Sequence, residues 1–235
     1  MIFNQYYYHP DLTTPIVTLS KEESEHCVRA LRHRNGDQVL LTDGKGCAAT
    51  AIVISDNPKA CMVEISEVHE ADDKNRIHLH LAIAPTKNID RIEWLVEKCV
   101  EIGIESVSFI LCENSERPRV NMERMNRIAI SALKQCQTTW LPPMEFIAFD
   151  EFLEKSAALV ADRFIAWCDD DNQRQLSTEN LQNEDVILLI GPEGDFSSRE
   201  IEAARQHGYV EVKLGNRRLR TETAGLYGCL LFATK

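Results

Sequence analysis

The chain has 235 residues, of which 44% are hydrophobic and 27% are charged, as in an ordinary globular protein with room for two domains. Its formal net charge of −11 argues against indiscriminate nucleic-acid binding, so any RNA contact must come from local basic clusters. No apolar run approaches the ~20 residues of a membrane span, and the N-terminus has no secretion-signal pattern. We therefore expect a cytoplasmic protein with no membrane contact.

The first 70 residues predict a small, mainly β unit. A strand at Gln5–Tyr8 precedes a helix that begins with a capping box of Ser20 and Glu23 and continues to about Leu31. Short strands at close spacing then favour a small barrel. These strands are expected at Gln38–Thr42, Thr50–Ile54 and Cys61–Val68.

Basic residues gather at the end of the first predicted helix, at Arg29, Arg32, His33 and Arg34. They could position an RNA phosphate backbone, with the side chains of 6–8, all tyrosine, stacking on bases. The alternative is a solvated helix end beside a partly buried tyrosine strand. The residues alone leave both interpretations open.

A polar stretch at 71–75 predicts the domain boundary, which gives domains at 1–70 and 75–235. The second domain opens with a strand over 77–84, followed by a helix that Asp90 can cap and Gly103 can end. Strands and helices then alternate to the end of the chain, which predicts a mostly parallel sheet with helices on both faces. The further elements are a strand at 107–111, a helix at 121–136, strands at 145–149 and 163–168, and a short helix between those two strands.

No metal site is expected. His78 and His80 share one face of their strand but lack a third ligand nearby, so a satisfied strand face is favoured. The carboxylates of 169–171 lack ligand spacing and read as a solvated loop. The eight cysteines are scattered singly without a C-x-x-C pair.

The last fifty residues carry the clearest ligand-binding pattern. A buried-type strand at 186–190 runs into Gly191-Pro192-Glu193-Gly194, and Ser197 with Glu200 forms a capping box for a short helix. A strand at 209–214 then meets Gly215, and Thr221 can cap a last helix. Both glycine loops follow the carboxyl ends of strands, the edge at which open α/β sheets bind ligands.

The first of these loops is poorly suited to phosphate. Glu193 lies in the turn and Asp195 follows it, and both carboxylates would repel an anion. Neither G-x-G-x-x-G nor G-K-[ST] occurs in the chain, which disfavours a dinucleotide oxidoreductase. A neutral or cationic ligand is therefore expected, and S-adenosylmethionine, a sulfonium, qualifies without being singled out.

The run IGPEGDFS followed by LGNRRLRTETAG resembles the C-terminal signature of the bacterial 16S ribosomal RNA (uracil-N3)-methyltransferases of the SPOUT superfamily. The resemblance extends over the whole chain, with one departure at Asp195, where many members have glycine. A Lys-Glu-Lys-Glu-Gly helix typical of the family is matched by Lys87, Glu93, Lys98, Glu101 and Gly103.

This resemblance implies a SPOUT-type α/β domain with a C-terminal trefoil knot, a PUA-like N-terminal RNA-binding barrel, and a homodimer whose active sites draw on both subunits. It also implies S-adenosylmethionine as cofactor and 16S rRNA, within the small ribosomal subunit, as substrate. The cofactor-binding residues carried over from the family are Leu189, Ile190, Gly191, Pro192, Glu193, Gly194, Leu214, Gly215, Arg218, Leu219 and Arg220.

Methylation of uracil at its ring nitrogen requires loss of the imino proton, which leaves negative charge shared with the flanking carbonyl oxygens. Arginine stays protonated, so our hypothesis gives Arg220 the role of stabilising the anion or positioning the nucleotide. Glu222 is the candidate base or orienting carboxylate, or else a first-turn helix acid favoured by the macrodipole. The candidate RNA-binding residues are Arg29, Arg32, Arg34, Lys87, Arg117 and Arg119.

Two alternatives stay open at this stage. The chain could be a SPOUT methyltransferase that acts on another RNA nucleotide or on a ribose hydroxyl. It could also be an RNA-binding or ribosome-assembly module without catalysis. Nucleoside analysis and binding of labelled cofactor separate these alternatives.

Overall fold

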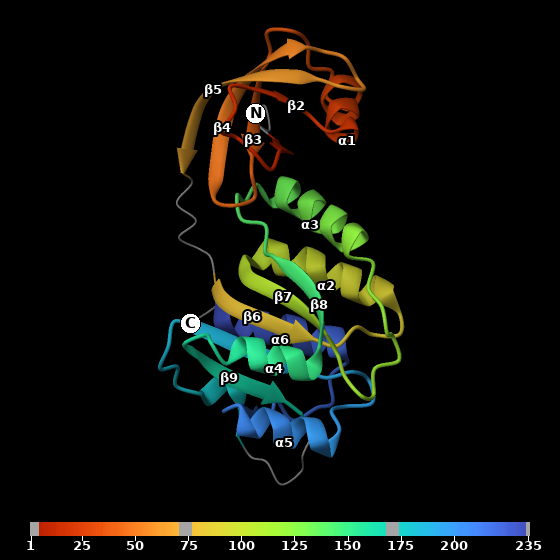
Figure 1. The fold of residues 1–235 in the computed structure, drawn as a ribbon, viewed down its shortest axis with the longest axis vertical. Helices are drawn as coiled ribbons and strands as arrows, with labels where there is room; N and C mark the ends of the chain where they lie inside the picture. The colour runs from red at the N-terminus through yellow and green to blue at the C-terminus, as the bar shows by residue number, and fades with distance from the viewer. Residues whose placement is uncertain (1–4, 71–76, 168–173, 234–235) are drawn as a thin grey trace. The chain divides into compact units, whose positions relative to one another are not determined.

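The computed structural model describes residues 5–70, 77–167 and 174–233 (Figure 1). The chain divides into two compact units, Met1–Asn75 with Ile130–Leu141, and Arg76–Ala129 with Pro142–Lys235. The polar stretch at 71–75, the acidic run at 169–171 and Cys168 lie outside the described residues. No helix within the described ranges is long and apolar enough to cross a membrane.

The first unit is built on one five-stranded sheet with the order β1-β3-β4-β5-β2. β1 pairs with β3 in parallel, and the other neighbours are antiparallel. Alternate side chains of these strands, among them Tyr7, Leu41 and Val53, fill an apolar core. The strands are β1 (Tyr6–Tyr8), β2 (Ile16–Thr18), β3 (Gln38–Thr42), β4 (Cys47–Ser55) and β5 (Met62–Glu70).

The first helix is shorter than the sequence predicts. Ser20 caps α1 (Lys21–Glu25) as expected, because its hydroxyl accepts the backbone N–H of Glu23. The chain then continues as a π-helix over His26–Ala30, and Arg32 follows with a positive φ of 61°. The single helix to Leu31 is therefore replaced by two segments that turn the basic residues outward.

The second half of α3 (Met122–Cys136) belongs to the first unit, which no feature of composition indicates. Lys134 Nζ lies 2.6 Å from Glu23 Oε1, and these side chains are only 15% and 7% exposed. Lys45 also forms a β-bridge with Trp140. A largely buried ion pair between residues far apart in the chain thus joins this segment to α1 of the first unit.

The second unit contains the predicted parallel sheet, with the order β11-β9-β10-β6-β7-β8. Every neighbouring pair is parallel, so all carboxyl ends lie at one edge. The expected α/β fold, with a mostly parallel sheet and a separate N-terminal β unit, is confirmed. The strands are β6 (Ile77–Ile83), β7 (Ile104–Leu111), β8 (Met144–Ala148), β9 (Ala161–Ala166), β10 (Asp185–Ile190) and β11 (Val210–Val212).

Helices cover both faces of this sheet (Figure 1). α2 (Ile89–Ile102) and α6 (Thr221–Ala233) pack together on one face, whereas α4 (Phe149–Ser156) and α5 (Ser198–Gln206) lie on the other. A short 3-10 turn, η2, spans Leu176–Thr178. α2 is capped by the Asn88 side chain, which accepts the N–H of Asp90, so the expected Asp90 cap is wrong. Gly103 ends α2 with a φ of 82°, as predicted.

Two glycines allow α6 to lie close to the sheet. A Cβ on Gly225 would come within 2.9 Å of Ile83 Cδ1 and 3.0 Å of Leu95 Cδ2. A Cβ on Gly228 would come within 2.3 Å of Leu188 Cδ2, which is fully buried. The close approach fixes the start of α6 at the carboxyl edge of β6 and β10.

Candidate active site

Four loops meet the carboxyl edge of the parallel sheet. Loop A (191–197) follows β10 and loop B (213–220) follows β11, while loop C (84–88) follows β6 and loop D (112–121) follows β7. β10 and β6 are neighbours in the sheet, so loops A and C begin side by side. The N–H of Ala84 in loop C donates to the Ile190 carbonyl at 2.9 Å.

Loop A is joined to the start of α6 by one hydrogen bond. The Thr221 hydroxyl donates to the Gly191 carbonyl at 3.2 Å. Thr221 is the first residue of α6 and is buried, so its predicted capping role is replaced by this contact. The two glycine-containing segments that the sequence singles out therefore meet in space.

Asp195 adopts the left-handed conformation that a glycine would accept easily, with a φ of 63°. Its N–H donates to the Pro192 carbonyl at 2.9 Å, and its Oδ1 accepts the N–H of Phe196 at 2.9 Å. Aspartate is among the residues that tolerate this conformation. The departure from the family pattern is thus accommodated locally.

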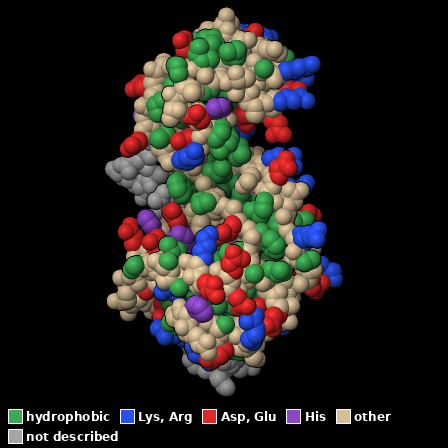
Figure 2. All heavy atoms as spheres, in the orientation of Figure 1, with side chains coloured by type: hydrophobic (Ala, Val, Ile, Leu, Met, Phe, Trp, Pro, Cys, Tyr) green, Lys and Arg blue, Asp and Glu red, His purple; other side chains and the backbone are tan. Residues whose placement is uncertain are grey.

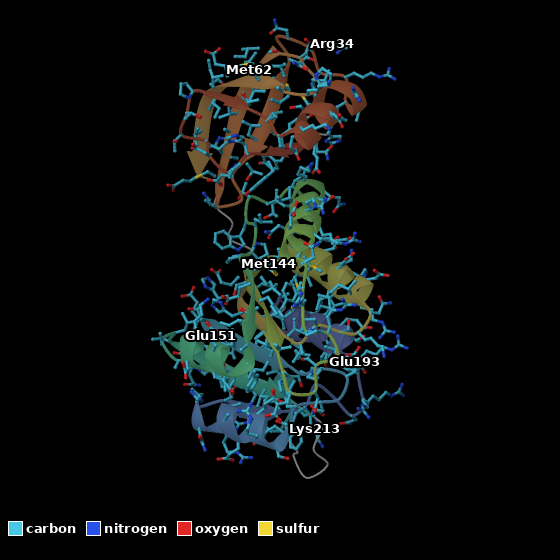
Figure 3. The ribbon with its side chains drawn as sticks, turned by 45° about the vertical axis from the view of Figure 1, so that its right-hand side comes forward. Arg34, Met62, Met144, Glu151, Glu193 and Lys213 are labelled. Carbon is cyan, nitrogen blue, oxygen red and sulfur yellow. The ribbon has the colours of Figure 1, made fainter. Side chains whose placement is uncertain are left out.

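Glu193, whose side chain is labelled in Figure 3, links loops A and C and retains an unused oxygen. Its Oε1 accepts the backbone N–H of Lys87 at 3.0 Å. Its Oε2 is buried and has no hydrogen-bond partner in the described part of the chain. The Lys87 ammonium instead lies 2.8 Å from Glu116 Oε2, a contact that raises the pKa of Lys87.

Two N–H groups of Arg117 in loop D donate hydrogen bonds to the backbone of loop C. Its Nε donates to the Thr86 carbonyl at 3.1 Å and its Nη2 to the Lys87 carbonyl at 2.6 Å. Of the predicted RNA contacts in this unit, Arg117 thus also holds a loop in place, whereas Arg119 is exposed.

Loop D is also fastened to loop A. Asn114 Nδ2 donates to the Asp195 carbonyl at 3.0 Å, and the N–H of Glu113 donates to Glu200 Oε1 at 2.8 Å. Glu200 is fully buried and forms the predicted capping box with Ser197. These contacts make loops A, C and D one connected framework.

Glu222 is a second buried carboxylate at this edge. It lies in the first turn of α6 and is 8% exposed. Arg91 Nε, from the first turn of α2, lies 3.6 Å from Glu222 Oε1. Glu222 Oε2 is buried without a hydrogen-bond partner in any of the three described ranges. Sequence reasoning did not select Arg91; its only signal is its place one turn after loop C.

The predicted cofactor residues fall into two groups. Leu189, Ile190, Gly191 and Pro192 are buried, so they can offer a ligand backbone groups rather than side chains. In loop B, Arg218 and Arg220 are exposed, Leu214 and Leu219 are half-buried, and Gly215 has a φ of 138°. Loops A and B therefore combine main-chain groups that can bind a ligand with two exposed arginine side chains.

Comparison with known proteins identifies the framework. Residues 73–233 match the family described as RNA methyltransferase domain, and residues 19–66 match the RNA methyltransferase PUA domain. The chain belongs to the RNA methyltransferase domain family. The resemblance drawn from the C-terminal motifs is thereby confirmed, and the match to the PUA model covers β3, β4 and part of β5 of the N-terminal sheet.

Solved and curated relatives cover nearly the whole of this family member. A probable rRNA-methyltransferase from Porphyromonas gingivalis is 39% identical, with a TM-score of 0.87, covering 98% of this chain and 97% of that one. A ribosomal RNA small subunit methyltransferase E from Neisseria gonorrhoeae, solved bound to S-adenosyl methionine, is 26% identical with a TM-score of 0.83, covering 98% and 97%. A Bacillus subtilis protein with that same enzyme name is 25% identical over 91% of this chain and 88% of that protein.

The basic residues of the PUA domain are solvent-exposed. Arg29, Arg32 and Arg34 are all exposed, with Arg34 labelled in Figure 3. Two of them form long ion pairs with carboxylates: Arg29 lies 3.7 Å from Glu25, and Arg34 lies 3.7 Å from Asp56. Tyr7, however, is 1% exposed and packs in the core, so its expected stacking role is wrong. Tyr6 and Tyr8 are half-buried.

Polar residues also gather at the amino edge of the methyltransferase sheet, around His78 and His80. His80 Nδ1 lies 2.8 Å from Ser106 Oγ, and His78 Nδ1 lies 3.2 Å from Asp185 Oδ1. No set of three or more metal-ligating side chains occurs among the described residues. The histidines thus have protein partners, as the favoured interpretation of that strand face requires.

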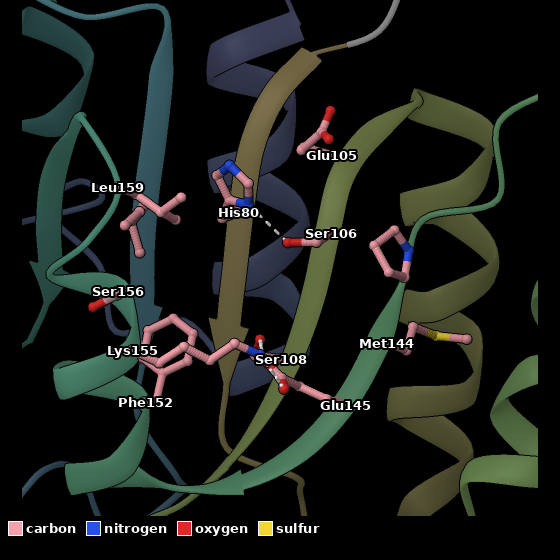
Figure 4. Close-up of a pocket in the computed structure, with 12 residues that line it drawn as sticks. His80, Glu105, Ser106, Ser108, Met144, Glu145, Phe152, Lys155, Ser156 and Leu159 are labelled. Atoms are coloured by element: carbon pink, nitrogen blue, oxygen red, sulfur yellow. Dashed lines mark hydrogen bonds and ion pairs between the residues drawn. The ribbon is translucent and has the colours of Figure 1, made fainter. Parts of the chain in front are cut away.

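A cavity of about 410 Å³ opens beside His80 on the face toward α4 (Figure 4). Its floor comes from the first halves of β6, β7 and β8, and its wall includes Phe152 and Leu159. Glu145 in the cavity accepts from Ser108 at 3.0 Å and pairs with Lys155 at 2.6 Å. None of its lining residues comes from loops A to D, so it is separate from the candidate active site. Acidic and basic side chains intermingle on the face of the molecule shown in Figure 2.

Proposed function

We propose that this protein transfers a methyl group from S-adenosylmethionine to N3 of a specific uridine in 16S rRNA of the small ribosomal subunit. One observation supports this chemistry most directly. The Glu222 carboxylate is buried at the carboxyl edge, has an unused oxygen and lies beside Arg91. The names of the relatives, rRNA methyltransferases of the small subunit, support the substrate class.

The residues of loops A and B suit this cofactor. Buried Gly191 and Pro192 leave main-chain groups bare, and the unused oxygen of Glu193 favours a ligand that donates hydrogen bonds or carries positive charge. The proposed pocket comprises the eleven residues from Leu189 to Arg220 that the sequence suggests. When bound, the cofactor supplies an electrophilic methyl group on a sulfonium.

Glu222 would act on the substrate as a proton acceptor. Removal of the imino proton from N3 leaves negative charge on the ring, and a buried carboxylate with an open acceptor position is suited to take that proton. Arg220, exposed in loop B, would position the target nucleotide or offset its charge. Thr221 would keep loop A and the start of α6 in register through its bond to Gly191.

The chain would work as a homodimer through the outer side of α6. Tyr227 and Leu230 on α6 are 38% and 46% exposed, and Trp94 on α2 is 43% exposed. α6 is apolar on nearly all sides, which is typical of a helix covered on both faces. Aromatic residues of this kind are enriched in protein interfaces.

RNA would be held mainly by the N-terminal domain. We assign residues 1–70 to RNA binding, with Arg29, Arg32 and Arg34 on phosphates, and residues 75–235 to the knotted methyltransferase domain. Lys87, Arg117 and Arg119 would contact RNA near the active site. Exposed cations on an otherwise acidic chain favour a narrow, structured target over RNA in general.

The test is incubation of the protein with methyl-labelled S-adenosylmethionine and small ribosomal subunits that lack the modification, followed by nucleoside analysis. Label in 3-methyluridine is the expected result. Label in another nucleoside would assign a different methylation reaction. No label despite saturable cofactor binding to the protein would favour another RNA, and no cofactor binding would leave a non-catalytic RNA-binding module.

A further inference from the structure

Arg91 and Glu222 form an isolated charged pair at the carboxyl edge. They come from the first turns of α2 and α6, two helices packed on the same face of the sheet. Their closest charged atoms, Arg91 Nε and Glu222 Oε1, are 3.6 Å apart, and the side chains are 35% and 10% exposed. Neither has another salt-bridge partner within the described ranges.

Both members of the pair have hydrogen-bonding capacity left over. Glu222 Oε2 is buried and unpaired in the part of the chain described, and the Arg91 guanidinium has five N–H donors. A buried acceptor without a donor is unfavourable, so a ligand that supplies the donor is favoured there. The terminal torsion of glutamate is soft, so rotation can bring either oxygen toward the Arg91 side.

The edge of the uracil ring that carries N3 matches this pair. It presents an N–H donor between two carbonyl oxygens, so a carboxylate can accept from N3 while a neighbouring guanidinium donates to one carbonyl. Cytosine presents an acceptor at N3 beside an amino group, which would face the carboxylate and the guanidinium with the wrong polarity.

We propose that Arg91 is a specificity-determining and anion-stabilising residue that reads the target uracil together with Glu222. This assignment rests on the proposed function. The N3–H bond breaks with its electron pair kept on the ring, and the proton passes to the Glu222 carboxylate. Arg91 binds the carbonyl oxygen on which the negative charge accumulates, and N3 then takes the methyl group as the sulfonium becomes a neutral thioether.

The other arginines near this edge are less suited to the role. Arg117 donates to two backbone carbonyls of loop C, and Arg124 forms a bidentate contact with Glu93. Arg220 is exposed and has no ion pair with Glu222 in the described structure. Arg91 is the arginine placed beside the buried carboxylate.

The experiment compares wild type, R91K and R91Q on small-subunit RNA assembled with uridine or with 5-fluorouridine. Fluorine makes the N3 proton more acidic, so it lessens the need for a cation that stabilises the ring anion. We expect R91Q to lower the single-turnover methylation rate ~10–100-fold while S-adenosylmethionine binding changes less than about twofold. R91K, which keeps the charge, should retain an intermediate rate.

The decisive quantity is the ratio of rates on fluorinated and ordinary RNA. It should rise at least ~5-fold in R91Q relative to wild type, because the substrate then supplies what the arginine provided. An unchanged ratio would overturn the assignment, since a merely structural loss slows both substrates equally. If R91Q melts at a lower temperature or loses the cofactor, the ratio is measured in R91K, whose differently placed charge should raise it above the wild-type ratio; an unchanged ratio there overturns the assignment. Absence of N3-methylated nucleoside with wild type on both RNAs, 3-methyluridine on one and its 5-fluoro derivative on the other, would instead refute the proposed function.

Discussion

The two edges of the parallel sheet differ in how their polar side chains are hydrogen-bonded. At the amino edge, His78, His80 and Asp185 contact one another or Ser106, and each has a partner within 3.5 Å. At the carboxyl edge, Glu193 and Glu222 each keep a buried oxygen without a partner in the described residues. Both groups look equally polar in the sequence.

This difference distinguishes polar side chains that pair within the protein from polar side chains that are available to a ligand. A native fold satisfies most buried polar atoms, so an exception that lies beside the predicted cofactor loops is a candidate ligand contact. The cavity at the amino edge has a volume of about 410 Å³, but its polar lining is largely paired within the protein. Among the described residues, buried atoms without a hydrogen-bond partner also occur in the first unit, at Tyr7 Oη and His26 Nδ1, so the position of Glu193 and Glu222 beside loops A to D is what marks the proposed active site.

The largest expected effect comes from removing the carboxylate at the carboxyl edge. E222Q should lower the methylation rate ~10²–10⁴-fold, because an amide cannot accept the imino proton. Binding of S-adenosylmethionine, measured by calorimetry, should be unchanged. A rate within threefold or so of wild type would remove Glu222 from the proton transfer and leave it as a first-turn helix acid.

The second largest effect is expected from disturbing the packing of α6 on the sheet, because α6 carries Glu222 to that edge. G228A should cost about 1–3 kcal/mol of unfolding free energy, since the added Cβ overlaps buried Leu188. G225A in the same helix is the matched comparison, with clearances of 2.9 and 3.0 Å, and should cost less. Denaturant titration measures both, and equal costs would contradict the packing account.

The fold was largely predictable, whereas the site was only partly so. Hydrophobic periodicity and glycine stops locate the strands and α2, and the motifs locate loops A and B. Where the chain turns decides that Asn88 rather than Asp90 caps α2. It also decides that Thr221 donates to Gly191. Arg91 and the second half of α3 depend on contacts between distant segments, which periodicity in one sequence does not encode.

A smaller effect is expected from the other unpaired oxygen. E193Q should weaken S-adenosylmethionine binding about tenfold while affecting the neutral product S-adenosylhomocysteine less, because it removes a negative charge from loop A. E116Q, which removes an exposed carboxylate of loop D, is the matched control. Equal weakening of both ligands would show that Glu193 shapes the loop rather than recognising charge.

At the amino edge the same kind of substitution should leave catalysis intact. H80A removes the partner of Ser106 and should cost about 1 kcal/mol of stability, with an unchanged methylation rate. Thermal unfolding and single-turnover rates measured together check this. A rate loss comparable to that of E222Q would contradict the distinction between the two edges.

The smallest effect is the pH dependence of a peripheral ion pair. A hydrogen bond from Arg124 lowers the pKa of Glu93, so the pair stabilises the fold above the ordinary glutamate pKa of about 4.3. E93Q should therefore cost ~1 kcal/mol at pH 7, and the difference should vanish as the pH falls through the lowered pKa. E123Q, an exposed neighbour on α3, controls for the lost charge. A difference that persists in acid would show that packing, not ionisation, is responsible.

Hydrogen exchange with and without S-adenosylmethionine tests the central claim most directly. The account predicts that added cofactor slows exchange in loops A and B and at the start of α6, with no change around His80, Ser106 and the cavity beside α4. Protection at that cavity, with loops A and B unaffected, would contradict the claim that the unpaired groups of the carboxyl edge mark the active site.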